Sequence, residues 1–318
     1  MPIHYPSQPT IFLVYATILL GILMVAGGTL AFMTIVLGRD VRPIWATYLS
    51  WCVLVPLVFV AIYWGRIPTI FLFTIFAVLG FKEFARATGL YRDWWMTGAG
   101  YLAIAATGIA ALVHNPNDGS PGWYGLYMAL PAYAIALFIM MPILRNHTQG
   151  QLQAVSLTIL GYIYIGWMFL HLAFLADCPN FKGYILFILV AVELNDVAAY
   201  VFGHLLGRRG RHQLRSNISP NKTWEGALGA LATSMALPWL LRFSFPYFGA
   251  TQLILTGLIV GIGGQLGDLS ISVIKRDLGI KDMGTLIPGH GGVLDRIDSL
   301  MYSAPLFLHM VHFYYKHW

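Results

Sequence analysis

The sequence contains little charge and almost no cysteine. Asp, Glu, Lys and Arg make up only 10% of its 318 residues, whereas hydrophobic residues make up 58%. Together with a mean hydropathy of +0.69, this composition excludes a soluble globular domain and indicates an integral membrane protein. The two cysteines, Cys52 and Cys178, form neither a disulfide framework nor a zinc site, so we interpret both as packing residues.

The apolar runs are continuous rather than alternating in polarity, which favours membrane-crossing helices over a membrane barrel. The sequence predicts an all-α, polytopic helical bundle of about nine to ten transmembrane helices. We expect the spans at 10–37, 43–64, 67–88, 94–113, 123–144, 152–175, 184–206, 225–248, 251–274 and 300–315. We divide the chain into N-terminal, lipid-facing scaffold helices (1–150) and a C-terminal catalytic region (151–318). The first residues lack the basic start of a signal peptide, so the first span is expected to be retained.

Lys and Arg are distributed unequally between the two ends of these predicted spans. One side holds 15 of the 19 basic residues, and it includes the long loops 207–224 and 275–299. Because basic residues concentrate in cytoplasmic loops, we expect both loops in the cytoplasm and both termini outside. The net charge of +6 follows from this distribution, so it does not indicate a nucleic acid partner.

Three acidic residues inside predicted spans, Glu193, Asp196 and Asp268, need an explanation. A carboxylate at the bilayer centre costs roughly 2.5–3.5 kcal/mol, so each one needs a cavity or a partner. Glu193 and Asp196 share a helix face, where they could bind a metal or take up protons. Asp268 and Asp295 flank a loop that can fold back and bring them together. Since Mg²⁺ prefers one or two carboxylates with water and phosphate oxygens, this pair predicts a magnesium site.

The stretch GLIVGIGGQLG, residues 257–267, contains five glycines. No strand precedes them and the dinucleotide-binding spacing is absent, so they do not indicate a nucleotide fingerprint. Pairs such as Gly257/Gly261 and Gly263/Gly267 instead predict close contacts between helices.

The stretch SPNKTWEG, residues 219–226, has the chemistry of a phosphate site. Ser219 and Asn221 suit an extended entry and a turn, and Lys222 and Thr223 can both donate hydrogen bonds to a phosphate. The start of the following helix also favours an anion. A Walker A loop is excluded because its glycine and lysine spacing is absent.

The segment 268–298 concentrates four basic residues, five aspartates and five glycines in 31 positions. Arginine can bind phosphate oxygens through two hydrogen bonds, glycines let backbone N–H groups approach a ligand closely, and the histidine can donate to a phosphate or a leaving group. We therefore predict site residues at Lys275, Arg276, Lys281, Asp282, His290, Gly291, Gly292 and Arg296.

Residues 272–298, SVIKRDLGIKDMGTLIPGHGGVLDRID, resemble the signature of the phosphatidate cytidylyltransferases, or CDP-diacylglycerol synthases. The segments 196–207, 219–226 and 267–269 are similar to the same family. The resemblance covers the C-terminal part of the chain, and the N-terminal half resembles the family only in being hydrophobic.

This resemblance implies a Mg²⁺-dependent enzyme of phospholipid biosynthesis. It would transfer a cytidylyl group from CTP to phosphatidic acid, giving CDP-diacylglycerol and pyrophosphate. Asp268 and Asp295 would bind the metal with Asp196 as a third contributor, while Lys281, Asp282 and His290 would be site residues without a defined role. The phosphates would be held by Lys222, Lys275, Arg276 and Arg296. The expected location is a bacterial inner membrane with the active site facing the cytoplasm; a second cation and a homo-oligomer stay open.

The expected chemistry needs no strong general base, because the attacking lipid phosphate is already ionised at neutral pH. Catalysis would consist of positioning and charge neutralisation. Three alternatives stay open: a CTP transferase acting on another lipid phosphate, an ion- or proton-coupled transporter using Glu193 and Asp196, and a family member that only acts as a scaffold.

Overall fold

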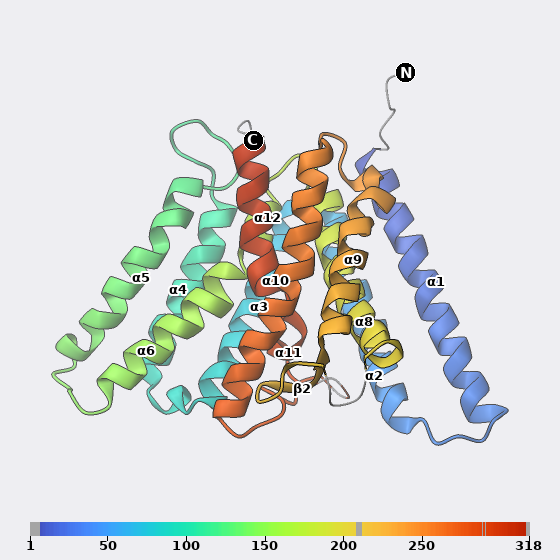
Figure 1. Cartoon of the computed structure of the whole chain (residues 1–318). Coiled ribbons are helices and arrows are strands. Elements are labelled where there is room, and N and C mark those ends of the chain that lie inside the picture. Colours follow the sequence, from blue (N-terminus) through green and yellow to red (C-terminus); the bar gives the residue numbers. More distant parts are fainter. Residues whose placement is uncertain (1–6, 208–211, 288, 290, 316–318) are drawn as a thin grey trace.

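The computed structural model describes residues 7–207, 212–287, 289 and 291–315, which form a helical bundle with one small β-hairpin (Figure 1). The long helices are α1 (Gln8–Ile35), α2 (Arg42–Trp64), α3 (Arg66–Ala87), α4 (Trp94–Leu112), α5 (Tyr124–Leu144), α6 (Gln151–Gly161), α8 (Phe181–Leu205), α9 (Trp224–Leu240), α10 (Ala250–Asp277) and α12 (Leu300–Tyr314). The shorter elements are η1 (Leu90–Arg92), η2 (Tyr162–Met168), α7 (His171–Leu175), β1 (Gln213–Arg215), β2 (Ser219–Thr223), η3 (Arg242–Ser244) and α11 (Leu294–Ile297).

The predicted all-α membrane fold is confirmed. Within the described residues, eight helical segments are long and apolar enough to cross a membrane: α1 to α5, the segment from α6 to α7, α8 and α10. The two other predicted spans form α9 and α12, of 17 and 15 residues, which is short of the ~20 residues that a perpendicular crossing needs. The predicted span 225–248 is too long, because the chain turns after Leu240 and Arg242 donates to the carbonyl of Phe245 (2.9 Å).

The two ends of the bundle differ in the loops that they carry. The start of α1 and the end of α12 lie at one edge, whereas the β1–β2 hairpin and the end of α10 lie at the opposite edge (Figure 1). The α1–α2 connection and the end of α3 lie at this second edge as well. The basic loops therefore share one edge, as the charge distribution predicts, and the described ends of the chain lie at the other.

The predicted span 152–175 is confirmed as the helical segment Gln151–Leu175, but this segment is not α-helical throughout. A π-helical segment, η2, separates α6 from α7. Gly161 and Gly166 allow close packing there, since a Cβ atom would lie 2.7 Å from Phe81 or 2.8 Å from Ile104. The extra residue that a π-turn inserts rotates the helix face, and Tyr164 of η2 donates to the carbonyl of Gly267 in α10 (3.2 Å).

The glycines of α10 lie where neighbouring helices approach most closely, as the sequence predicts. A Cβ at Gly257 would be 2.8 Å from Met235 of α9, and one at Gly263 would be 2.9 Å from Ser303 of α12. At Gly267 it would lie 2.2 Å from the carbonyl oxygen of Asp298. These small residues bring the polar segments of α10 and α11 into direct contact.

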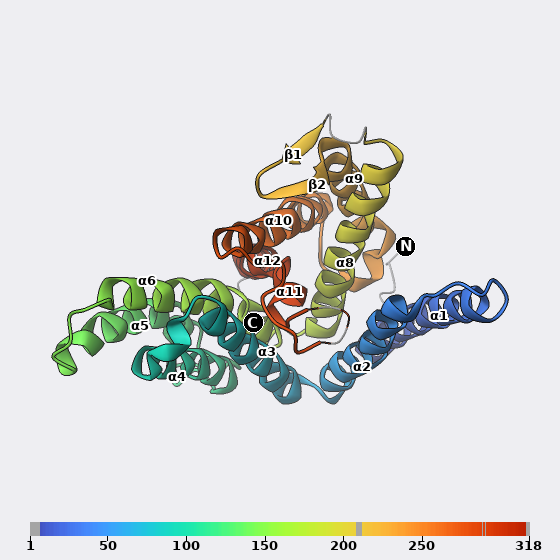
Figure 2. The ribbon, with the colours of Figure 1, turned by 90° about the horizontal axis from the view of Figure 1, so that it is seen from below.

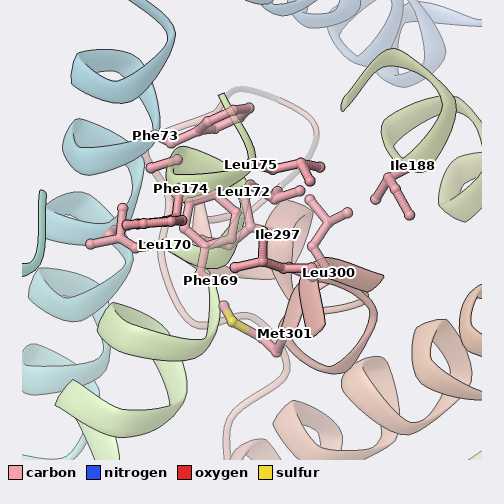
Figure 3. Close-up of a cluster of buried hydrophobic side chains, with 14 of the residues drawn as sticks. Phe73, Phe169, Leu170, Leu172, Phe174, Leu175, Ile188, Ile297, Leu300 and Met301 are labelled. Atoms are coloured by element: carbon pink, nitrogen blue, oxygen red, sulfur yellow. The ribbon is translucent and has the colours of Figure 1, made fainter. Parts of the chain in front are cut away.

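The C-terminal helices α8 to α12 form one group, with α1–α2 on one flank and α3 to α6 on the other (Figure 2). A buried cluster joins α11 and α12 to α3, α7 and α8 (Figure 3). Ile297, Leu300 and Met301 contribute to it from the C-terminal side, and Phe73 and Phe169 from the N-terminal side. Close packing of this kind leaves few low-energy alternatives, so the cluster fixes α11 and the residues that it carries.

Candidate active site

Asp295 of α11 binds the backbone of the α10–α11 loop, residues 278–293, at two places. Its carboxylate is buried, and Oδ2 accepts hydrogen bonds from the backbone N–H groups of Met283 (2.9 Å) and Gly292 (3.0 Å). Oδ1 accepts a hydrogen bond from Lys275 Nζ at 2.9 Å, which forms a nearly buried ion pair. With three donors around it, this carboxylate fixes the loop against the end of α10.

Glu83 of α3 holds the same loop from the other half of the chain. Its side chain is buried, and each carboxylate oxygen accepts one backbone N–H: Oε1 from Val293 (3.0 Å) and Oε2 from Leu294 (2.8 Å). A carboxylate at the first residues of a helix is electrostatically favoured. The start of the short helix α11 is therefore bound by the carboxylate of Glu83, which lies 210 residues before Val293 in the sequence.

Two glycines leave room for Glu83. A Cβ at Gly292 would be 2.3 Å from Oε2, and a Cβ at Gly284 would be 2.5 Å from Oε1. Gly291 adopts φ +81°, a left-handed conformation that favours glycine, and it packs beside Asp282 and Asp295. The glycines of this loop thus allow the carboxylates of Glu83 and Asp295 to approach the backbone closely. Gly289 packs equally closely against Thr47 of α2.

The β1–β2 hairpin is bound to α10 at the same edge of the bundle (Figure 2). Lys222, next to the end of β2, forms an ion pair with Asp268 Oδ2, and Ser272 donates to Asp268 Oδ1 (3.2 Å). Arg276 Nε donates to the carbonyl of Ile218 at 3.2 Å. The structure therefore brings the two predicted phosphate-binding segments together.

Three aspartates from different elements lie around this contact. Ser299 donates to Asp196 Oδ2 of α8 (3.1 Å), and Asp298 Oδ1 accepts the backbone N–H of Ser299 (2.8 Å). Burial, together with the charges of Asp268 and Asp196, raises the pKa of Asp298 well above its usual value. A concentration of negative charge in a buried site requires a cation or a proton to balance it.

Arg296 is placed to interact with these acids. Its charge acts on both Glu193 and Asp196, and its Nε is buried without a hydrogen-bond partner among the described residues. An arginine N–H that is left unpaired in a buried place is costly unless a ligand supplies an acceptor. The phosphate-binding role predicted for Arg296 is consistent with this geometry.

The other predicted site residues lie at the rim. Ser219, Asn221 and Thr223 belong to β2, and Thr223 Oγ1 caps α9 by accepting the N–H of Gly226 (3.1 Å). Lys281 and Asp282 are exposed in the α10–α11 loop. His290 lies outside the residues that the structure describes, so its predicted role stays a prediction.

The predicted magnesium ligands differ in their availability. Mg²⁺ uses one or two carboxylates and completes its shell with water and phosphate oxygens, and Asp196 and Asp268 supply suitable oxygens. Asp295 is the most enclosed of the three predicted ligands, because its two oxygens accept three hydrogen bonds, whereas Asp268 is partly exposed. Over the described residues, no three His, Cys, Asp or Glu side chains are grouped closely enough to hold a metal by themselves. The donor chemistry of Asp196 and Asp268 fits magnesium only in combination with phosphate.

Two residues of the site were not singled out from the sequence. The sequence signal for Glu83 was a carboxylate within a predicted span, next to Lys82, but its partner could not be identified from local sequence. Asp298 is the last residue of the signature segment, and only the fold places it beside Asp196 and Asp268. For both residues the missing information is a long-range contact.

Comparison with known proteins places this arrangement in a family. The profile of the cytidylyltransferase family matches residues 45–314, a range that includes every predicted site residue and Glu83. The chain belongs to the cytidylyltransferase family.

Individual relatives of this cytidylyltransferase-family chain match different shares of its length. The phosphatidate cytidylyltransferase of Staphylococcus aureus (strain COL) is 43% identical over 207 residues, which are 64% of this chain and 76% of that protein. The phosphatidate cytidylyltransferase of Staphylococcus haemolyticus is 42% identical over 154 residues, 48% of this chain and 56% of the relative. The uncharacterized protein YnbB of Escherichia coli is 39% identical over 176 residues, 54% and 58% of the two chains. The chain thus spans less than two thirds of the length of the last two relatives.

Proposed function

We propose that this protein transfers the cytidylyl group of CTP to the phosphate of phosphatidic acid, forming CDP-diacylglycerol and pyrophosphate. The observation that carries the proposal is the contact of the β1–β2 hairpin with α10, where Lys222 pairs with Asp268 and Arg276 binds Ile218. Family membership and two relatives named phosphatidate cytidylyltransferase support the substrates.

In the proposed reaction a phosphate oxygen of the lipid attacks the α-phosphorus of CTP. The bond from the α-phosphorus to the bridging oxygen breaks, and pyrophosphate leaves with the electron pair. Both reactants are anions, so the protein must reduce their repulsion and align them. Lys222, Lys275 and Arg296 provide positive charge for this purpose, and Arg296 already has an unpaired, buried Nε.

The ion pairs of the site keep these cations in position before the substrates bind. Lys222 is balanced by Asp268, and Lys275 by Asp295. Of the two, the Lys222 pair is the less buried, with side-chain exposures of 25% and 28%. We assign to Lys222 an exchange of its carboxylate for a substrate phosphate, whereas Lys275 stays with the loop.

Asp196 and Asp268 are the residues that would hold Mg²⁺, with Asp298 as a third carboxylate near them. A bound Mg²⁺ would neutralise charge on the phosphates of CTP. Asp295 we assign instead to holding the α10–α11 loop. The proposed location is a bacterial inner membrane with this edge of the bundle facing the cytoplasm, where CTP arrives from water and the lipid from the bilayer.

The direct test uses the purified full chain in detergent micelles with radiolabelled CTP, Mg²⁺ and phosphatidic acid. We expect label in CDP-diacylglycerol and an equal amount of pyrophosphate, both dependent on the lipid and on Mg²⁺. Polyprenyl and ether-linked lipid phosphates serve as competing substrates, and a preference for either would replace phosphatidic acid in the proposal. Absence of any labelled lipid, with transport of an ion in reconstituted vesicles, would contradict the enzymatic function altogether.

A matched pair of variants tests the role of the hairpin. Lys222→Ala removes the cation that pairs with Asp268, whereas Arg215→Ala removes an exposed cation from the neighbouring strand β1. We expect a rise in the CTP requirement or a fall in turnover, of roughly tenfold or more, only for Lys222→Ala. Equal kinetics of the two variants would mean that the basic residues of the hairpin only set the orientation of the protein in the membrane.

A further inference from the structure

A polar pocket lies at the same edge of the bundle, away from the residues of the candidate active site. It has a volume of about 490 Å³ and is formed by the segment after α3 and the segment between α5 and α6. This volume is within the ~300–1,000 Å³ of typical small-molecule sites. Its residues include Arg92, Asp93, Arg145, His147 and Gln151.

On one side of the pocket, Asp93 and Arg145 are held by hydrogen bonds and an ion pair. Asp93 caps α4 by accepting the N–H of Met96 (3.2 Å), and both of its carboxylate oxygens accept hydrogen bonds from Arg145 Nη1 (2.8 and 2.7 Å). The ion pair joins the two segments that form the pocket. Since Asp93 and Arg145 neutralise each other, the remaining charge of the pocket comes from Arg92.

Gln151 has a buried polar atom that lacks a partner. The residue is only 8% exposed, and its Nε2 donates to the carbonyl of Gln149 (3.3 Å), yet its Oε1 has no hydrogen-bond donor among the described residues. A buried acceptor without a donor destabilises the folded state. A ligand with a hydroxyl or amino group would remove this cost by donating to Oε1.

The same side of the pocket favours an anion. Gln151 is the first residue of α6, and Gly150 before it provides no side-chain cap within the described residues, so the start of α6 favours a negative group. Arg92 is exposed beside it, and its side chain forms no ion pair within the described part of the chain. A phosphate between Arg92 and the α6 N-terminus would satisfy both.

The surroundings of the pocket are those of a membrane interface. Trp94 and Trp95, directly after Asp93, are 61% and 62% exposed, and tryptophan is enriched where bilayer and water meet. Leu144 and Leu152, on either side of the α5–α6 connection, are 67% and 84% exposed. A ligand with its polar part in the pocket would therefore have apolar surface next to it.

We propose that this pocket binds the headgroup of an anionic phospholipid that carries a hydroxyl group, as phosphatidylglycerol does. The phosphodiester lies between Arg92 and the N-terminus of α6, and the headgroup hydroxyl donates to Gln151 Oε1. The acyl chains follow the exposed leucines of α5 and α6. This site shares no residue with the proposed catalytic site, and its occupancy does not depend on CTP.

The test measures binding of phosphatidylglycerol to the delipidated full chain by native mass spectrometry, without CTP. We expect Arg92→Gln and Gln151→Leu each to weaken the first binding event roughly tenfold, a loss of about 1.4 kcal/mol. Arg39→Gln is the matched control, because it removes an exposed basic residue of the α1–α2 connection at the same edge. Equal weakening in Arg39→Gln would show general attraction to basic loops and overturn the proposal.

Two further experiments identify the chemical class of the ligand and the site that binds it. Glycerophosphoglycerol carries the same phosphodiester and headgroup hydroxyls without acyl chains, so we expect it to compete only weakly. Competition as strong as that of the lipid would make this a site for soluble phosphate esters. Lys222→Ala should leave the first binding event unchanged. If that variant loses it, the lipid occupies the proposed catalytic site, and the pocket at Arg92 is not a phospholipid site.

Discussion

Asp268 and Asp295 each pair with a lysine, but the two carboxylates differ in their remaining contacts. Asp268 accepts one further hydrogen bond, from the Ser272 hydroxyl, and is partly exposed. Asp295 is 7% exposed and accepts two backbone N–H groups in addition to Lys275. We infer that Asp268 is available to a ligand and that Asp295 is committed to the fold.

Replacing these two residues by asparagine should therefore give different results. Asp268→Asn should lower turnover by roughly 100-fold or more with little change in unfolding temperature, because it removes charge near the substrates but few contacts. Asp295→Asn should lower both, since loss of one partner of a buried ion pair costs about 3–5 kcal/mol. Pyrophosphate release and thermal unfolding would be measured on the same samples. An Asp295→Asn protein as stable as the wild type would contradict our distinction.

We expect Asp177, at the edge of the bundle opposite the active site, to make the stability of the protein depend on pH. Arg66 forms an ion pair with Asp177 and donates to the carbonyls of Ala111 (2.6 Å) and Leu112 (3.0 Å). Burial raises the pKa of Asp177 to about 7, although Arg66 acts in the opposite direction. The folded state thus binds this proton up to a higher pH than the unfolded state, whose aspartate has a pKa of about 3.9.

The sign follows from proton linkage. Between about pH 4 and 7 the folded protein holds more protons at this position, so stability falls as the pH rises through this range. We expect the unfolding temperature to fall from pH 5 to 7.5, and to fall less in Asp177→Asn. Asp118→Asn, in an exposed turn, is the control. Parallel curves for the wild type and Asp177→Asn would rule out Asp177 as the cause.

Among the elements, α3 makes the largest unexpected contribution to the site. It is one of the helices that the sequence assigns to the N-terminal scaffold, yet its Glu83 accepts both N–H groups at the start of α11. The division of the chain at residue 150 stays a prediction, but contacts between α3 and α11 cross it. A helix of four residues such as α11 cannot form alone, so α3 and the buried cluster of Figure 3 determine its position.

Glu83→Gln tests this contribution. The amide nitrogen of glutamine would face one of the two backbone N–H groups, which leaves a buried donor unpaired at a cost of about 1–3 kcal/mol. We expect a fall in turnover of roughly tenfold with a lower unfolding temperature. Lys82→Gln removes charge from the same turn of α3 and should change neither quantity. Full activity of Glu83→Gln would show that the loop keeps its conformation without this carboxylate.

The whole molecule places its basic loops at one edge and its described ends at the other (Figure 1). The β1–β2 hairpin with Ser216 and the α4–α5 connection with Asn117 lie at opposite edges, and both residues are exposed. Because 15 of the 19 basic residues belong to the hairpin side, the hairpin should face the cytoplasm.

This orientation can be measured with single cysteines in a protein from which Cys52 and Cys178 have been replaced by serine. In intact cells, a membrane-impermeant maleimide should label Asn117→Cys, whereas Ser216→Cys should require permeabilised cells. The reverse pattern would place the proposed active site on the outside, where CTP is not supplied.

Much of this molecule follows from local sequence. Hydrophobic runs predict the helices, because each must satisfy its own backbone hydrogen bonds in a bilayer. Charge counts predict which loops share an edge, and the signature around His290 predicts the site segments. These properties depend on residues close together in the chain, so no tertiary contact is needed to identify them.

The partners of the buried charges were decided by tertiary structure alone. Lys222 pairs with Asp268, Glu83 binds the start of α11, and Asp298 lies near Asp196, across separations of 46, 210 and 102 residues read from the sequence. The π-helical segment η2 also depends on tertiary structure, since side chains from α3 and α4 pack on Gly161 and Gly166. A hydrogen bond or an ion pair acts over a few ångströms in space, and sequence spacing does not determine which distant residues the packed helices bring within that range.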